Sequence, residues 1–368
     1  MARHVTPHFA SPFLTGSIRG SRSWQFVNGP SGQGVLDLYT NELTAYVNPN
    51  SPLQVQQANT FDLTHTQAVV NWINGKTAAA GTKLGTGNEV GLVAFANFQT
   101  VVKAQNAYYL GWANVTGGYQ SANYTPTKVL ADAFTFVDQQ VGRIIDTLQQ
   151  TGAWNNTLLV LTATYGGAPV NKTSELNVGD PGAIITAVSG GPGTADYTKS
   201  VDLLLIWYHN RSVVNASCAY LLAHRADLHA SGPQSRVYCG ADVAAYIGYT
   251  SADFAKYPTW PDILVIPDPG VVYTTSTHFA VVHGGDSVED RRVPLVVGGG
   301  AVTLAQAGKI GTAVDSRQVA PTVLTYLGLD PSQLQGVVAE GTVVLPGVLV
   351  KKNALIISID GWHQGDLD

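Results

Sequence analysis

Charged residues are scarce in this chain of 368 residues. They make up 12% of it, roughly half the usual share for a globular protein, and 20 basic against 25 acidic side chains leave a net charge of −5. The chain therefore lacks the basic face that nucleic-acid binding requires. It also lacks any run of about 18 apolar residues, so we expect no membrane span. A hydrophobic share of 45% excludes a chain that is mainly disordered.

Cysteine is rarer still, with Cys218 and Cys239 alone. A disulfide between them would close a loop of about 20 residues and stabilise the fold by roughly 3 kcal/mol. Two buried free thiols are the alternative. We predict the disulfide, which favours a location outside the cell. The first residues, MARHVTPHFASPF, lack the apolar segment of a secretion signal.

Acceptor sites for N-linked glycans are more frequent than the composition requires. Chance placement of the asparagine, serine and threonine residues would give about three such sequons, and the chain has six. The excess indicates a secreted glycoprotein, and the alternative is a loop composition rich in threonine and asparagine. The six candidate sites are Asn114, Asn123, Asn155, Asn171, Asn210 and Asn215.

Short apolar runs alternate with amphipathic segments along most of the chain. This alternation predicts an α/β fold with a central mixed, mostly parallel sheet and helices on both faces. The clearest helix is expected at 127–148. No linker divides the chain, so we expect an irregular arm at 1–24, one domain at 25–347, and a last strand at 348–368. The buried members of the sheet are expected at 157–162, 203–208, 262–266, 293–297 and 354–359.

Two residues with metal-binding chemistry follow apolar runs. Asp360 comes directly after the last run, in ISIDG, and the carboxyl end of a buried parallel strand is where α/β sheets bind ligands. Its carboxylate suits a divalent cation, or alternatively the N-cap of a helix. His283 precedes Gly284 and Gly285, which allow a tight turn beside a ligand. The alternative is a loop histidine held by hydrogen bonds.

Several segments, taken together, resemble the alkaline phosphatase superfamily, and specifically its type I phosphodiesterase/nucleotide pyrophosphatase branch. HGGDSVEDRRVPLVVGG and NALIISIDGWHQGDLD carry much of the likeness. The family's IDG strand opens its proteins, whereas here it comes last, as in a circularly permuted or strand-exchanged chain. The similar segments lie at 28–43, 131–166, 262–273, 283–299, 316–346 and 353–368.

The resemblance implies two divalent metals, commonly zinc, that clamp the oxygens of a phosphoryl transfer. It assigns Asp360 and His283 as metal ligands. Thr164 and Tyr165 stand where the family has Asp-His or Lys-His before glycine, and neither is a good zinc ligand. The nucleophile turn that should follow IDG is not found. The pattern therefore implies at most a partial zinc site.

Three readings of function stay open at this point. One is a secreted, glycosylated protein that has this fold and is catalytically impaired. Another is a metal-dependent phosphodiester or pyrophosphate hydrolase. The third is a segment of a longer or tandem polypeptide.

The last strand offers a further prediction. Its connector at 347–353 spans at most about 25 Å, so the strand can complete its own sheet or that of a neighbouring copy, and repeated exchange would build a filament.

Overall fold

The computed structural model describes residues 13–18, 36–39, 43–48, 51–79, 81–85, 91–107, 117–120, 124–170, 195–200, 202–274, 280–300, 302, 308, 311–346 and 353–366. The chain forms two compact units built from interleaved segments. Unit 1 comprises Met1–Ala104, Ala131–Thr164 and Pro294–Trp362, and unit 2 comprises Gln105–Leu130, Tyr165–Val293 and His363–Asp368. The segment expected as one domain, 25–347, contributes to both units.

Unit 1 is built around a six-stranded sheet with the order β11-β4-β12-β3-β1-β2. Every neighbouring pair is parallel except β11 with β4, which confirms the predicted mixed, mostly parallel sheet. Its strands are β1 (Phe13–Ile18), β2 (Asp37–Tyr39), β3 (Gly91–Phe98), β4 (Thr157–Thr162), β11 (Val296–Gly299) and β12 (Asn353–Ile359).

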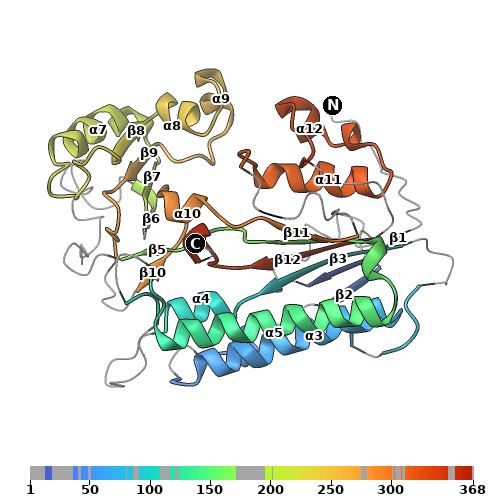
Figure 1. The fold of residues 1–368 in the computed structure, drawn as a ribbon. Coiled ribbons are helices and arrows are strands. Elements are labelled where there is room, and N and C mark those ends of the chain that lie inside the picture. Colours follow the sequence, from blue (N-terminus) through green and yellow to red (C-terminus); the bar gives the residue numbers. More distant parts are fainter. Residues whose placement is uncertain are drawn as a thin grey trace. The chain divides into compact units, whose positions relative to one another are not determined.

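Helices cover both faces of this sheet. The long helices α3 (Gln54–Ile73) and α5 (Lys128–Gln150) lie along one face, and α11 (Val319–Tyr326) and α12 (Gln335–Glu340) lie on the other (Figure 1). The short helices α2 (Leu43–Tyr46) and α4 (Thr100–Gln105) belong largely to the same unit. A cluster of buried side chains from α11, β4 and β12 forms the core beneath α11: Leu158, Val160, Val319, Val323, Tyr326 and Ala354.

The last strand, β12, occupies the middle of the sheet. It pairs with β3 from Ala354 opposite Val93 to Ile359 opposite Phe98, and with β4 along its other edge. Ile357 is fully buried. Here β12 completes the sheet of its own chain, while exchange between copies stays a prediction.

One predicted irregular region contains a strand. Residues 13–18, within the expected arm at 1–24, form β1, which pairs with β3 and β2. The segment FLTGSI has weak period-two alternation, because Gly16 and Ser17 follow Thr15. Its backbone pairing with β3, which the local sequence does not encode, makes it a strand.

Unit 2 contains a separate four-stranded antiparallel sheet with the order β6-β7-β9-β8. The prediction that 203–208 and 262–266 belong to the central sheet is therefore wrong. Both faces of β9 are covered, because Ile263 and Val265 pack in one core cluster and Leu264 and Ile266 in another. A strand that is buried on both faces has the same continuous apolar sequence in a parallel or an antiparallel sheet, so the sequence pattern does not assign it to one of the two. The strands are β6 (Ala195–Ser200), β7 (Leu204–Tyr208), β8 (Arg236–Cys239) and β9 (Ile263–Ile266).

Short elements complete unit 2. The helices are α7 (Val214–Ala223), α8 (Ala241–Tyr246), α9 (Ser251–Lys256) and α10 (Val288–Arg291), and β5 (Ala168–Pro169) pairs with β10 (Val281–Val282). The disulfide Cys218–Cys239 joins α7 to β8, with 6.2 Å between the two Cα atoms. It confirms the predicted bond over the alternative of two free thiols.

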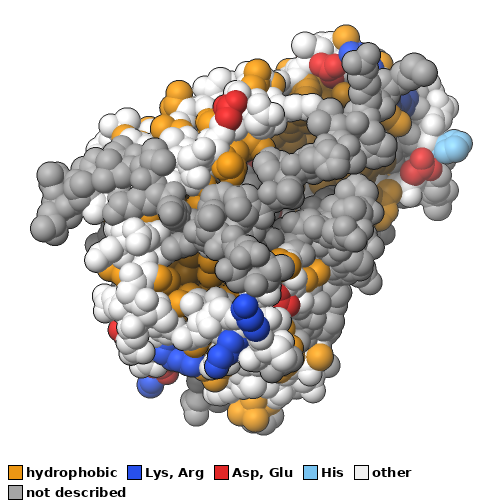
Figure 2. Space-filling view, turned by 90° about the vertical axis from the view of Figure 1, so that its right-hand side faces the viewer, with side chains coloured by type: hydrophobic (Ala, Val, Ile, Leu, Met, Phe, Trp, Pro, Cys, Tyr) orange, Lys and Arg blue, Asp and Glu red, His pale blue; other side chains and the backbone are white. Residues whose placement is uncertain are grey.

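The surface reflects the low charge of the sequence. Lys, Arg, Asp and Glu side chains are few on the coloured part of the face shown in Figure 2. Three of the candidate glycan sites, Asn155, Asn210 and Asn215, are exposed, and Asn114, Asn123 and Asn171 lie outside the described residues. No described helix combines the length and the hydropathy needed to cross a membrane.

Helix α3 buries two titratable side chains against the end of β3. Asp62 is fully buried and accepts hydrogen bonds from the backbone N–H groups of Gln99 and Thr100. The ring of His65 packs at a tilt of 58° against that of Phe61, with centroids 4.1 Å apart, and its Nδ1 lies 3.0 Å from the carbonyl oxygen of Asn97. Burial lowers the pKa of His65 to about 4 from its ordinary 6.5.

We predict that His65→Gln makes unfolding less sensitive to acid. Between pH 6.5 and 4 the folded chain holds fewer protons on His65 than the unfolded chain does, because burial lowers the pKa of His65. Acidification through this window therefore removes up to about 3 kcal/mol of unfolding free energy in the wild type. The unfolding free energy of the variant should fall less over the same pH range, as measured by urea unfolding at pH 7, 5.5 and 4.

The control is His224→Gln. That ring also packs against an aromatic side chain, Tyr220, and contacts a backbone carbonyl, but it is only half-buried. Burial raises the pKa of Asp62 to about 7, and this carboxyl shifts stability in the opposite direction. The prediction therefore concerns the difference in unfolding free energy between variant and wild type, to which Asp62 contributes equally in both. A difference that stays constant across the three pH values would contradict it.

Candidate functional site

The carboxyl ends of three neighbouring parallel strands bring polar side chains together in unit 1. Because β12 lies between β3 and β4, the residues at the ends of these strands meet at one edge of the sheet, where α/β folds bind ligands. Asp360 follows β12, Asn97 and Gln99 stand at the end of β3, and Thr164 comes two residues after β4. The sequence placed Asp360 at this edge, and the structure agrees.

Asp360 is buried and fully occupied by neutral donors. Only 6% of its surface is exposed. Its Oδ1 accepts hydrogen bonds from Thr164 Oγ1 at 3.0 Å and from Ser358 Oγ at 3.4 Å. Its Oδ2 accepts from Asn97 Nδ2 at 3.1 Å and from Gln99 Nε2. The carboxylate caps no helix, so the N-cap alternative is not what the structure shows.

A second buried carboxyl, that of Asp62, shares Gln99 with this site. Asp62 is held by the backbone N–H groups of Gln99 and Thr100, the first residue of α4. Burial, to which the charge of Asp360 adds, raises the pKa of Asp62 to about 7. The groups that contact these two acids donate hydrogen bonds but carry no positive charge. The site is thus organised around neutral hydrogen bonding.

His283 belongs to unit 2 and has a different environment. It is exposed, and its ring stacks on Tyr165 with centroids 4.1 Å apart and planes at 22°. Gly284 follows with a φ of 97°, a backbone conformation that glycine adopts readily. Asp360 and His283, the two ligands implied by the resemblance, are thus described in separate units.

The described residues around Asp360 and His283 do not fit a pair of zinc ions. Both oxygens of Asp360 accept N–H and O–H hydrogen bonds, and its partners are amide and hydroxyl groups, whereas protein zinc ligands are thiolate, imidazole and carboxylate. Thr164 contacts Asp360, and Tyr165 stacks on His283. Within the described residues, no three His, Cys, Asp or Glu side chains lie together in a way that would hold a metal.

Sequence reasoning missed Asn97, Gln99 and Ser358. The stretch from Asn97 to Thr116 has no carboxylate or histidine, and the amides within it were not considered as part of the site. The rule that drew attention to Asp360, a polar residue at the end of an apolar strand, would have selected Asn97 and Gln99 as well. Ser358 lies within the apolar run and is buried. A polar residue inside that run was the only sequence feature that could have indicated its place in the site.

The comparisons with known proteins agree with this fold. The sequence model of the type I phosphodiesterase/nucleotide pyrophosphatase family matches residues 27–287. That match ends before β12, so it does not include Asp360. No curated protein sequence matches the chain.

One solved structure supports this fold, at low sequence identity. Human ectonucleotide pyrophosphatase/phosphodiesterase 5 superposes with a TM-score of 0.50 and 12% identity, over 86% of this chain and 67% of that one. Its murine counterpart gives 0.44 and 13%, over 78% and 61%. A mutant of the alkaline phosphatase PafA gives 0.46 and 14%, over 74% and 48%. The chain therefore spans about half to two thirds of these proteins, and the fold inference rests on the human one.

The family match covers well over half of the chain, and the central sheet with its two helical layers agrees with it. The chain belongs to the type I phosphodiesterase/nucleotide pyrophosphatase family.

Proposed function

We propose that this chain is an extracellular glycoprotein that has the fold of the type I phosphodiesterases but does not carry out their two-metal hydrolysis. The observation that supports this most directly is the environment of Asp360. Four neutral donors from Asn97, Gln99, Thr164 and Ser358 occupy its two oxygens. A metal ligand would instead need its lone pairs directed at a cation.

The energetics favour the hydrogen-bonded carboxylate over a metal-bound one. Moving Asp360 onto a cation would leave amide and hydroxyl hydrogens in a buried site without acceptors, at a cost of about 1–3 kcal/mol each. Further ligands would have to repay that cost. Thr164 offers only a hydroxyl group, and the carboxyl of Asp62 already accepts hydrogen bonds from two backbone N–H groups.

The alternative remains a metal-dependent hydrolase of phosphodiesters or pyrophosphates, the activity class of the family. It requires ligands and a nucleophile from residues that the structure does not describe. The two functions differ in metal content and in turnover, so one preparation distinguishes them.

We predict that the purified chain holds less than one zinc ion and turns over bis(p-nitrophenyl) phosphate negligibly, with or without added zinc. Zinc is measured by mass spectrometry of the metal, and nitrophenolate release is followed by absorbance. Asp360→Ala controls for contaminating hydrolases, since it should leave any residual rate unchanged. Two zinc ions per chain, or a turnover within the usual range of about 1–10³ s⁻¹ that Asp360→Ala abolishes, would contradict the proposal.

The extracellular part of the proposal rests on the disulfide and on the exposed sequons. Disulfides persist in oxidising compartments, and Cys218–Cys239 is formed here. Asn210 accepts a hydrogen bond from the backbone N–H of Ser212 through its Oδ1, which leaves its exposed amide nitrogen for a glycan. Asn155 and Asn215 are exposed as well.

We predict N-glycans at the exposed sequons when the chain passes through a eukaryotic secretory pathway. Asn155→Gln should lower the intact mass by one glycan. Asn156→Gln is the matched control, because Asn156 is its exposed neighbour but does not begin a sequon. If treatment with an N-glycosidase leaves the mass of the secreted chain unchanged, the glycoprotein assignment is wrong.

We also propose that copies of the chain associate by exchanging β12. The strand is central, apolar and paired on both edges, so a sheet without it would expose the edges of β3 and β4. The same pairing and burial are available to the strand of a second copy. Since the exchange is head-to-tail, it gives a ring or an open filament.

Exchange predicts that the chain runs above the mass of one copy at micromolar concentration. Light scattering coupled to size exclusion measures this mass, and deletion of residues 348–368 should give a monomeric or unfolded product. A wild-type mass of 38.8 kDa plus glycans that does not change with concentration would contradict the exchange.

A further inference from the structure

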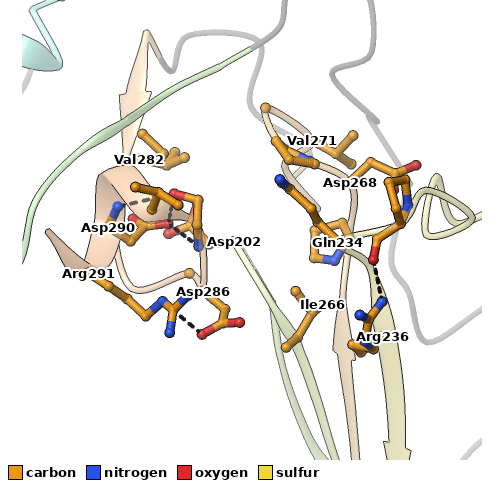
Figure 3. A pocket seen from close by; sticks show the side chains of 18 of the residues that line it. Asp202, Gln234, Arg236, Ile266, Asp268, Val271, Val282, Asp286, Asp290 and Arg291 are labelled. Atoms are coloured by element: carbon orange, nitrogen blue, oxygen red, sulfur yellow. Dashed lines mark hydrogen bonds and ion pairs between the residues drawn. The ribbon is translucent and has the colours of Figure 1, made fainter. Parts of the chain in front are cut away.

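Unit 2 contains a cavity of about 330 Å³ whose lining includes none of the partners of Asp360. Its walls come from the ends of β8 and β9, from the loop after β9, from β10, and from α10 with the turn before it. Figure 3 shows Asp202 and Asp290 side by side on one wall, with Gln234, Ile266 and Arg236 across from them. The volume falls at the lower end of the range for small-molecule sites, about 300–1,000 Å³.

The first observation is a buried carboxyl that has no partner. Asp202 is 8% exposed, it lines the cavity, and neither of its carboxyl oxygens makes a hydrogen bond. An isolated buried carboxylate is costly, so a group of this kind needs a proton or a ligand. Burial, together with the neighbouring Asp290, raises the pKa of Asp202 to about 8.

The second observation is that another buried carboxyl, that of Asp290, lines the same wall of the cavity. It is 6% exposed. Its Oδ2 accepts hydrogen bonds from Ser287, while its Oδ1 has no partner. A Cβ added at Gly285 would lie 2.5 Å from Asp290 Oδ2 and 3.2 Å from Asp202 Cβ. The two acids therefore approach each other across Gly285, where a larger residue would intrude.

The basic residues of the cavity wall do not neutralise this pair. Arg236 donates hydrogen bonds to the carbonyl oxygens of Pro233 and Ser235, each at 2.6 Å. Arg291 pairs with Asp286, with 3.3 Å between Nε and Oδ1. Both guanidinium groups are thus engaged elsewhere. Burial raises the pKa of Asp290, and the neighbouring His283 offsets this only in part.

The remaining walls distinguish between kinds of cation. Ile266, Val271 and Val282 are buried apolar residues that line the cavity. A hydrated metal ion would place its water molecules against these apolar side chains, which is unfavourable. Throughout the described part of the chain, no cluster of three metal-ligating acidic, histidine or cysteine side chains is present. A ligand with a cationic head and an apolar body satisfies both walls.

We propose that this cavity binds a small organic ammonium ion, whose N–H groups donate to Asp202 and Asp290 and whose alkyl part packs against Ile266, Val271 and Val282. The ammonium supplies the hydrogen-bond donors and the positive charge that the carboxyl group of Asp202 has no partner for in the structure. Binding of this kind is independent of phosphodiester hydrolysis and of the state of Asp360.

The test uses alkylammonium chlorides as probes on the full chain, with affinity measured by isothermal titration calorimetry. n-Butylammonium should bind with one site. Its affinity should exceed that of methylammonium by about fourfold for each buried methylene. 1-Butanol, which has the same alkyl chain without the charge, should not bind detectably. This series needs no variant.

Asp202→Asn should weaken n-butylammonium binding by about tenfold or more, because a charge-assisted hydrogen bond is lost. It should still fold, since it removes a buried carboxyl that has no partner. Asp227→Asn is the matched control, with the same change in net charge at an exposed site outside the cavity, and it should bind as the wild type does.

Three results would overturn the proposal. These are no binding of n-butylammonium to the wild type, equal binding to Asp202→Asn, and binding of calcium or magnesium chloride in its place, which would assign the acids to an inorganic cation. Equal affinity for methylammonium and n-butylammonium would remove the role given to the apolar wall.

Discussion

The pairing of β12 with β3 and β4 is the constraint on which unit 1 depends. The strand is the middle member of the parallel part of the sheet, and its side chains at Ala354, Leu355, Ile357 and Ile359 are buried. Without it, the backbone edges of β3 and β4 would lose their partners inside the unit, and unpaired buried backbone groups are costly. The C-terminal segment is therefore as central to the unit as any segment before it.

The same strand creates the candidate site. By separating β3 from β4, it brings the end of each strand against Asp360, and this explains why amide groups at positions 97 and 99 and a hydroxyl group at 164 contact one carboxylate. Just beyond Asp360, the chain enters unit 2. There His363 is 2% exposed and packs against the rings of Tyr119 and Tyr124, while Asp366 accepts a hydrogen bond from the hydroxyl of Tyr119. The end of the described chain is thus fixed by buried contacts in each unit.

Two buried acidic centres in the chain illustrate how environment decides what a carboxyl group can do. In unit 1, neutral donors from four side chains contact both oxygens of Asp360. In unit 2, Asp202 is as deeply buried but has no donor at all. The first is a hydrogen-bonded structural element, and the second is an incomplete interaction that a ligand would complete. Burial alone does not distinguish them, whereas the partners do.

The sequence by itself determined the elements and much of their type. Apolar runs gave the strands at 157–162 and 354–359 to within a residue, and helical spacing gave α5. The position of Asp360 after its strand followed from the α/β rule, whereas the altered metal site that Thr164 and Tyr165 imply stays a prediction. These features are local, because periodicity and residue type act over a few positions.

Tertiary structure alone decided which strands share a sheet. The runs at 203–208 and 262–266 are as apolar as those of the central sheet, because helices cover both faces of the sheet that contains them. They nevertheless pair with each other in a second sheet. Likewise, FLTGSI is a strand only because β3 lies beside it. Three of the four partners of Asp360 come from positions more than 190 residues away, and the pair Asp202 and Asp290 is formed by segments far apart in the chain. Such contacts depend on how the chain folds back on itself, which no local pattern encodes.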